Sequence, residues 1–262
     1  MIRLPFRQKR QLGQHFLVDE NILGVAARLA ELGEKDVVLE VGPGLGVLTR
    51  FLADRVAFVH AVEIDAGLEP RLRELFESRH DVNLVFDDAL SLALAELTPA
   101  PTKFVANLPY NVATPLVIES LDGLPTVELW CVMVQREVAD RFFARPGTKS
   151  YGAVSVLVQL TAERTGFHAV SRTVFRPPPN VDSALVAFRR RREWGPEFPH
   201  VKRIVQAAFS HRRKTLANSL ALAGVSKRDE AESALARLGH PTAARAETLS
   251  PEEFIRLGEL VP

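Results

Sequence analysis

Cysteine is nearly absent from this chain of 262 residues, because Cys131 is the only one. A lone cysteine excludes an intramolecular disulfide framework and any metal site built from several thiolates. Cys131 also lies within an apolar run, which favours core packing over a nucleophilic role. We therefore predict no metal centre and a reducing, cytoplasmic environment.

Long hydrophobic runs are also missing. No stretch reaches the length of about eighteen apolar residues, so the sequence predicts no transmembrane helix and no membrane partner. No apolar segment follows the basic N-terminus, and we expect no secretory signal. The apolar content of 47% and the charged content of 25% are typical of a soluble globular protein.

Acidic residues are lacking from the first 18 positions, a basic tail that includes Arg7, Lys9 and Arg10. Basic residues also prevail at the other end. Residues 186–262 carry 14 Lys and Arg against 9 Asp and Glu, whereas residues 1–185 carry 19 against 23. This uneven charge could be ordinary solvated surface, but we predict that both ends contact nucleic-acid phosphates.

Short continuous apolar runs alternate with amphipathic segments. Such runs predict strands buried on both faces, as in a parallel sheet covered by helices. The runs are at residues 37–41, 58–63, 82–86, 103–106 and 129–134, with helical patterns at 45–54 and 68–78. Two later strands, at 167–174 and 184–188, are expected to be antiparallel. The sequence therefore predicts a doubly wound, mostly parallel α/β sheet of seven strands.

The pattern changes near residue 190. Pro196 and Pro199 follow a run of four arginines and indicate a linker, and only helical patterns appear from residue 201 onward. We therefore predict a large domain over residues 1–190 and a small all-α domain over residues 191–262.

A glycine-rich loop follows the first predicted strand. Residues 40–46, with Gly42 and Gly44, allow the backbone to turn sharply and to approach a ligand closely. Glu63 ends the second strand, where an acid can accept hydrogen bonds from both hydroxyls of a ribose. The loop alone could be a plain turn, but the acid at this distance favours a nucleoside site.

The composition of the loop argues against a dinucleotide. Val47 stands where a third glycine would be expected, and the Glu40 carboxylate is unfavourable beside a pyrophosphate but favourable beside a cation. S-adenosylmethionine combines ribose, adenine and positive charge without phosphate, and we predict it as the cofactor. The residues expected to bind it are Glu40, Gly42, Gly44, Glu63 and Ile64, the last against the adenine face.

Two aspartates, Asp87 and Asp88, follow the third strand. Asp88 can accept a hydrogen bond from the adenine amine of the cofactor. The alternative is that the pair caps the next turn or helix.

The fourth strand ends in Asn107-Leu108-Pro109-Tyr110, next to the predicted cofactor crevice. The N6 amine of adenine is a weak nucleophile because its lone pair is delocalised into the ring. The Asn107 side-chain oxygen and the Leu108 carbonyl can accept from its two N–H groups and favour a more reactive nitrogen. Pro109 fixes the turn, and Tyr110 can stack on a base that has left its helix. Catalysis would then depend on alignment rather than on a strong general base.

A second aromatic wall for this base is expected from Phe175, which precedes Arg176 and three consecutive prolines. The alternative is that Phe175 is an ordinary core residue at the end of a strand.

With these motifs in place, the chain resembles the small-subunit ribosomal RNA adenine N6,N6-dimethyltransferase family over nearly its whole length. The matching segments are residues 12–17, 40–46, Glu63, Asp88 with Ala89, 107–110, the late loop at 175–183 and the C-terminal signature at 209–216. The resemblance implies a methyltransferase-type sheet and cofactor contacts at His15, Leu17, Gly42, Glu63, Asp88, Ala89 and Asn107. His15 is a departure, since asparagine is common there, but an imidazole can also donate and accept.

The resemblance also implies the substrate. It would be two adjacent adenines in the 3′-terminal hairpin loop of small-subunit ribosomal RNA, within an assembling subunit, modified by a monomeric enzyme. The run His211-Arg212-Arg213-Lys214 is expected to begin a helix, with RNA contacts from Arg212, Arg213 and Lys214. The alternative is a solvated helix face with some intramolecular pairing.

Two other functions stay open at this point. Macrolide-resistance methyltransferases share the sheet and the tetrapeptide but act on large-subunit ribosomal RNA, and the proline-rich loop and basic cluster favour the small-subunit group. A non-catalytic assembly or transcription factor on the same fold could lose its site residues freely. Glu63, Asn107, Pro109 and Tyr110 are all present, so we predict an active enzyme.

Overall fold

The computed structural model describes residues 15–17 and 19–261, so the predicted contacts Arg7, Lys9 and Arg10 lie outside the described residues. The chain forms two compact units. Unit 1 comprises the described residues up to Ala139 together with Arg164–Arg190, and unit 2 comprises Asp140–Glu163 and the residues from Arg191 onward. Residues 140–163 thus group with the C-terminal helices. The predicted boundary between a methyltransferase domain and an RNA-binding domain at residue 190 stays a prediction.

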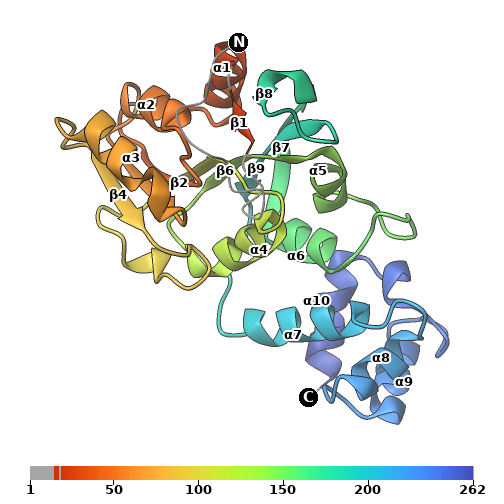
Figure 1. Ribbon diagram of the computed structural model, residues 1–262. Coiled ribbons are helices and arrows are strands. Elements are labelled where there is room, and N and C mark those ends of the chain that lie inside the picture. The colour runs from red at the N-terminus through yellow and green to blue at the C-terminus, as the bar shows by residue number, and fades with distance from the viewer. Residues whose placement is uncertain (1–14, 18, 262) are drawn as a thin grey trace. The chain divides into compact units, whose positions relative to one another are not determined.

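Unit 1 is built on a seven-stranded sheet in the order β4-β3-β2-β5-β6-β9-β7 (Figure 1). The strands are β2 (Val37–Val41), β3 (Phe58–Glu63), β4 (Val82–Phe86), β5 (Lys103–Asn107), β6 (Leu129–Gln135), β7 (Ala162–Val170) and β9 (Ser183–Arg190). Strands β2 to β6 pair in parallel, and β9 pairs antiparallel to β6. The predicted doubly wound, mostly parallel sheet is confirmed.

One late strand differs from the prediction. Strand β7 covers Ala162–Val170 instead of residues 167–174. It ends at Val170 because the Ser171 side chain accepts a hydrogen bond from the Thr173 amide and caps a 3-10 turn over Arg172–Val174. A short two-stranded sheet forms separately from β1 (Phe16–Leu17) and β8 (Phe175–Arg176).

Helices α1 (Glu20–Leu29), α2 (Val47–Ala53), α3 (Glu69–Phe76) and α4 (Ala113–Gly123) belong to unit 1 and bury apolar side chains. Helix α5 (Arg136–Phe142) crosses the division between the units, and α6 (Ala153–Thr161) belongs to unit 2. Leu23 of α1 and Leu52 of α2 share one core cluster with Cys131 of β6. Cys131 is fully buried, as predicted, and burial raises the pKa of its thiol to about 12.

Unit 2 contains α7 (Phe198–Phe209), α8 (Leu216–Leu222), α9 (Arg228–Arg237) and α10 (Pro251–Leu260), drawn in blue in Figure 1. Helix α10 begins at Pro251, because the Ser250 side chain accepts from the Glu253 amide and proline occupies the first turn. None of the helices within residues 15–17 and 19–261 combines the length and apolar character that crossing a membrane requires.

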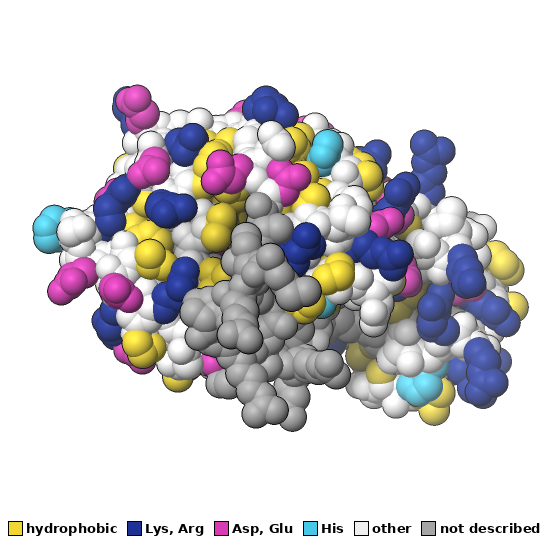
Figure 2. Space-filling view, turned by 45° about the horizontal axis from the view of Figure 1, so that its top comes forward, with side chains coloured by type: hydrophobic (Ala, Val, Ile, Leu, Met, Phe, Trp, Pro, Cys, Tyr) yellow, Lys and Arg dark blue, Asp and Glu magenta, His cyan; other side chains and the backbone are white. Residues whose placement is uncertain are grey.

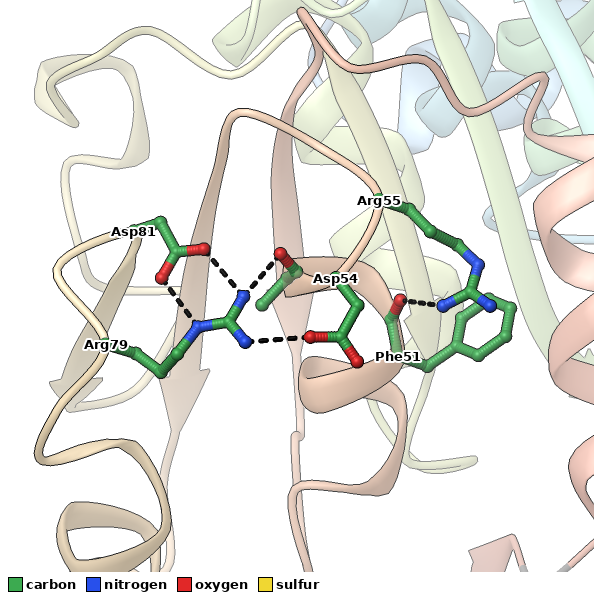
Figure 3. Close-up of polar contacts among 6 residues, drawn as sticks. Phe51, Asp54, Arg55, Arg79 and Asp81 are labelled. Carbon is green, nitrogen blue, oxygen red and sulfur yellow. Dashed lines mark hydrogen bonds and ion pairs between the residues drawn. The ribbon is translucent and has the colours of Figure 1, made fainter.

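Arg79, just before β4, binds the C-terminal end of α2 (Figure 3). Its guanidinium donates to the two carboxylate oxygens of Asp81 at 2.8 and 2.7 Å and to Asp54 Oδ1 at 2.8 Å. These bonds raise the pKa of Arg79 and lower the pKa of Asp81. Because they join the start of β4 to the end of α2, they stabilise the sheet edge opposite the carboxyl ends of the strands.

Candidate functional site

A cavity opens at the carboxyl ends of β2, β3 and β5, the place where open α/β sheets bind ligands. Four separate segments of unit 1 line it: the described start of the chain, the glycine loop, the end of β3 and the tetrapeptide after β5. The predicted site residues among its lining are His15, Leu17, Glu40, Gly42, Gly44, Glu63, Ile64, Asn107, Leu108, Pro109 and Tyr110.

The glycine loop packs tightly against two other walls of this cavity. Gly42 has a φ of 79°, and a Cβ atom there would lie 3.3 Å from the Pro109 ring. Gly44 has a φ of 57°, and its Cβ would lie 2.9 Å from the Phe16 ring. Both positions therefore require glycine, for backbone conformation and for space. The loop brings the predicted cofactor and target motifs into contact.

Glu63 is held in place by backbone amides. Its Oε2 accepts from the Gly44 amide at 3.0 Å, and its Oε1 accepts from the Asp65 amide at 2.9 Å. Burial raises the pKa of Glu63, while these two hydrogen bonds act in the opposite direction. A carboxylate oxygen can accept more than one hydrogen bond, so each keeps the capacity to bind a ribose hydroxyl.

Glu40 is the most deeply buried acid of the cavity, with 1% of its surface exposed. Burial raises its pKa to about 8, the Thr49 hydroxyl beside it lowers the pKa somewhat, and the nearby Glu63 raises it. Glu40 Oε2 is buried and has no hydrogen-bond partner among residues 15–17 and 19–261. A buried carboxyl oxygen that keeps its capacity to accept, beside a cavity, fits a cationic ligand such as the positively charged S-adenosylmethionine.

The Glu40→Gln variant should lose much of the pH dependence of folding stability. The folded-state pKa of about 8 lies above the usual 4.5, so protonation of Glu40 favours the folded state. This contribution to stability is full below pH 4.5 and is lost as the pH rises through about 8. Urea unfolding at about pH 5 and about pH 9 should show a fall in unfolding free energy that is roughly 2–4 kcal/mol larger in the wild type. Equal falls in both proteins would contradict this assignment.

Asn107 is oriented by His15, the first residue that the structure describes. Its Nδ2 donates to the His15 carbonyl at 3.1 Å, so Oδ1 is the side-chain atom that can accept from a substrate. The Leu108 amide donates to the Met133 carbonyl of β6 at 3.1 Å, and the Val112 amide donates to Pro109. We name Asn107, Leu108, Pro109 and Tyr110 the target clamp.

Tyr110 has two neighbours at the site, the predicted residue His15 and Ser183, which the sequence did not indicate as a site residue. Its hydroxyl lies 2.5 Å from Ser183 Oγ, a fully buried group at the start of β9. Its ring lies 5.5 Å from the His15 imidazole, whose Nδ1 donates to the Pro177 carbonyl at 2.9 Å. The position of Ser183 at the end of the late-loop signature was the available signal. The late loop and the described start of the chain thus orient the aromatic side of the clamp.

Phe175 does not line this cavity. It pairs with Leu17 across β8 and β1 and is fully buried. Both side chains belong to the same core cluster. Because pairing with β1 directs this side chain into the core, the structure supports the alternative of a core phenylalanine. The contact of Phe175 with a target base stays a prediction.

Asp88 and Ala89 also lie outside the lining of the cavity. Asp88 Oδ1 accepts from the Leu90 amide at 3.0 Å, and Asp87 Oδ1 accepts from the Asp88 amide at 2.7 Å, so both aspartates cap a turn. Asp88 nevertheless follows β4, whose Phe86 pairs with Glu63, and it stands at the same sheet edge as the cavity. Its contact with the cofactor stays a prediction.

The basic cluster of unit 2 is exposed but lies in the connection between α7 and α8. The expectation that it begins a helix is wrong, because the Thr215 side chain accepts from the Asn218 amide and α8 starts only at Leu216. Arg212 donates to the Lys149 carbonyl at 3.1 Å, whereas Arg213 and Lys214 extend from the same exposed turn. Their contact with RNA stays a prediction.

Comparison with known proteins gives a consistent result over the full length. A model of the family described as ribosomal RNA adenine dimethylase matches residues 5–261. A Rubrobacter xylanophilus protein named ribosomal RNA small subunit methyltransferase A is 50% identical, over 96% of this chain and 94% of the relative. Its namesake from Thermobifida fusca is 43% identical, over 99% of this chain and 92% of the relative.

Solved structures show the same fold. The crystal structure of the 23S rRNA methyltransferase ErmE has a TM-score of 0.65 at 32% identity, and covers 94% of this chain and 99% of its own. A dimethyladenosine transferase from Plasmodium falciparum has a TM-score of 0.71 at 23% identity, and covers 93% and 96%. The sheet is therefore of the methyltransferase type.

Proposed function

The chain belongs to the ribosomal RNA adenine dimethylase family, and from this membership we propose that it dimethylates the N6 amines of two adjacent adenines in the 3′-terminal hairpin loop of small-subunit ribosomal RNA. Relatives named for the small subunit reach 50% identity, whereas the large-subunit methyltransferase ErmE reaches 32%. This difference favours the small subunit. The substrate would be an assembling subunit in the cytoplasm, and the enzyme would act as a monomer.

S-adenosylmethionine would supply the methyl group when bound. The residues present fit it, because Glu40 offers a carboxyl oxygen without a partner among the described residues for positive charge, and Glu63 offers acceptors for the ribose. Gly42 and Gly44 let the loop pack against Pro109 and Phe16 at the wall of the cavity. The remaining contacts that we propose are His15, Leu17, Ile64, Asp88, Ala89 and Asn107.

The arrangement around Asn107 is the observation that carries the proposed reaction. With Nδ2 bound to the His15 carbonyl, Oδ1 remains as the side-chain acceptor of Asn107, and Leu108 lines the same cavity. We propose that Oδ1 and the Leu108 carbonyl bind the two N–H groups of one amine. Tyr110, oriented by Ser183, can stack on the adenine ring. The methylated amine is acidic enough to lose its proton to water, so these residues act by alignment.

The RNA contacts that we propose are Arg7, Lys9 and Arg10 in the basic tail and Arg212, Arg213 and Lys214 in unit 2. Basic and acidic side chains are interspersed over the face of the molecule in Figure 2, so affinity for a polyanion must come from local clusters. The turn between α7 and α8 is such a cluster, because three cations follow one another without an acid.

Replacing Arg213 by Ala should weaken binding to small subunits and reduce its dependence on salt. Loss of one phosphate contact should lower the slope of log affinity against log salt concentration by about 0.7–0.9. Filter binding over a range of salt concentrations measures this slope. The control is Lys227→Ala, which removes an exposed charge from unit 2 outside the cluster and should leave the slope unchanged. An unchanged slope for Arg213→Ala would rule out the phosphate contact.

The proposed reaction is tested by transfer of radiolabelled methyl groups to ribosomal subunits from a strain without this modification. We expect label in small subunits, and primer extension should locate it at two adjacent adenines. Label in large subunits alone would favour the macrolide-resistance activity. Binding to small subunits without transfer would favour a non-catalytic assembly factor.

A further inference from the structure

We propose that a second groove of unit 1 binds the nucleotide next to the adenine held in the target clamp. This inference rests on the proposed function. The groove is lined by Gln135, Arg136, Arg172, Asn180, Val181 and Asp182, together with the acid Glu137. We name it the flanking groove.

The flanking groove begins directly beside the target clamp. Its residue Gln135 pairs with Ser183 across β6 and β9, and the Ser183 hydroxyl lies 2.5 Å from the Tyr110 hydroxyl. Asp182 of the groove precedes Ser183 and lies close enough to Tyr110 for its charge to contribute to the raised pKa of that phenol, after burial and against the Ser183 hydrogen bond. A strand of RNA with one base on Tyr110 would therefore place its next nucleotide at or near this groove.

The walls of the groove are preformed. Asp182 joins them, because its Oδ1 accepts from the Arg172 amide at 3.1 Å and its carbonyl accepts from the Arg136 amide at 3.0 Å. The Arg172 guanidinium donates to the Asn180 carbonyl at 3.4 Å. These bonds connect the late loop to the end of β6, so little ordering would be needed when a ligand binds.

The side chains of the groove match the parts of a nucleotide. Arg136 and Arg172 are exposed and carry the planar donors that suit a phosphate. Gln135 and Asn180 offer amides that can donate to and accept from a base edge. Val181, with 46% of its surface exposed, offers an apolar contact for a ribose or a base face. The acids Glu137 and Asp182 make the groove less suitable for a bare anion than for a nucleotide with donor groups.

The proposed substrate gives this groove a use. Two adjacent adenines cannot both occupy one clamp, so the second must lie elsewhere while the first is methylated. A groove that holds the neighbour at a defined place would align the first adenine and keep the second one close to the clamp. Neither role requires a contact with the cofactor.

The test uses the full chain with the double variant Arg136→Gln/Arg172→Gln, assayed on small subunits from an unmethylated strain. The matched control is Arg28→Gln/Lys35→Gln, which removes two exposed charges from the same unit near the amino end of β2. We expect kcat/KM to fall about tenfold or more in the groove variant, as loss of charge-assisted hydrogen bonds to the substrate predicts, and to stay near the wild-type value in the control. Affinity for S-adenosylmethionine should be unchanged in both.

Three outcomes separate the possible results. A wild-type chain that does not label small subunits would refute the proposed function, whatever the variants do. An active wild type with a groove variant equal to the control would overturn the flanking groove alone. A groove variant with lower activity but the wild-type salt dependence of subunit binding would indicate a ribosomal-protein contact, and would also overturn the nucleotide assignment.

Discussion

Replacing Asn107 by Ala is expected to reduce methyl transfer by roughly a hundredfold or more, the scale found when one preorganised polar group is removed from an active site. The variant loses Oδ1, the side-chain acceptor that remains for the substrate amine while Nδ2 donates to the His15 carbonyl. Single-turnover transfer to unmethylated small subunits at saturating S-adenosylmethionine measures the effect on the chemical step.

The Asn107→Asp variant separates the acceptor role from the structural one. It keeps an acceptor oxygen, but it cannot donate to the His15 carbonyl, so the start of the described chain loses this tether. We expect weaker cofactor binding than in the wild type, yet faster transfer at saturation than in Asn107→Ala. Equal transfer rates in the two variants would show that the tether, and not the acceptor, matters for the reaction.

Replacing Glu63 by Ala is expected to damage both cofactor binding and folding. The amides of Gly44 and Asp65 would lose their acceptors inside a site where Glu63 itself is 5% exposed. Each buried donor without a partner costs about 1–3 kcal/mol, so the loss of two acceptors should lower the unfolding free energy by roughly 2–6 kcal/mol. Loss of the ribose acceptors should weaken S-adenosylmethionine binding by about a hundredfold.

Urea unfolding and titration calorimetry measure these two effects independently. The control is Glu69→Ala, which removes an acid of α3 that forms an exposed ion pair with Arg73. Exposed pairs contribute about 0–1 kcal/mol, so this variant should bind the cofactor normally and unfold almost as the wild type does. Cofactor affinity within about threefold of the wild type in Glu63→Ala would exclude the ribose contact.

Much of this architecture is encoded in local patterns of the chain. A strand buried on both faces must be apolar at successive positions, so the sequence predicts residues 37–41 and 58–63 with the bounds that the structure has. The bounds of residues 82–86 are also correct, although this strand lies at the sheet edge and is only half-buried. The order of strands with intervening helices leaves few topologies, and the carboxyl ends of parallel strands must meet at one edge. Glu40, Glu63 and Asn107 therefore line one cavity, as their places at strand ends indicated.

Other features depend on contacts between segments that are far apart in the chain. Ser183 meets Tyr110, and Pro177 meets His15, only because the late loop folds back onto the sheet. Phe175 carries the same aromatic ring whether it faces a substrate or the core. Its pairing opposite Leu17 places the ring among core side chains. Composition and spacing cannot specify such directions, because strand register and loop packing are set by the whole hydrophobic core. Local sequence thus identifies the atoms of the target clamp, and long-range packing orients them.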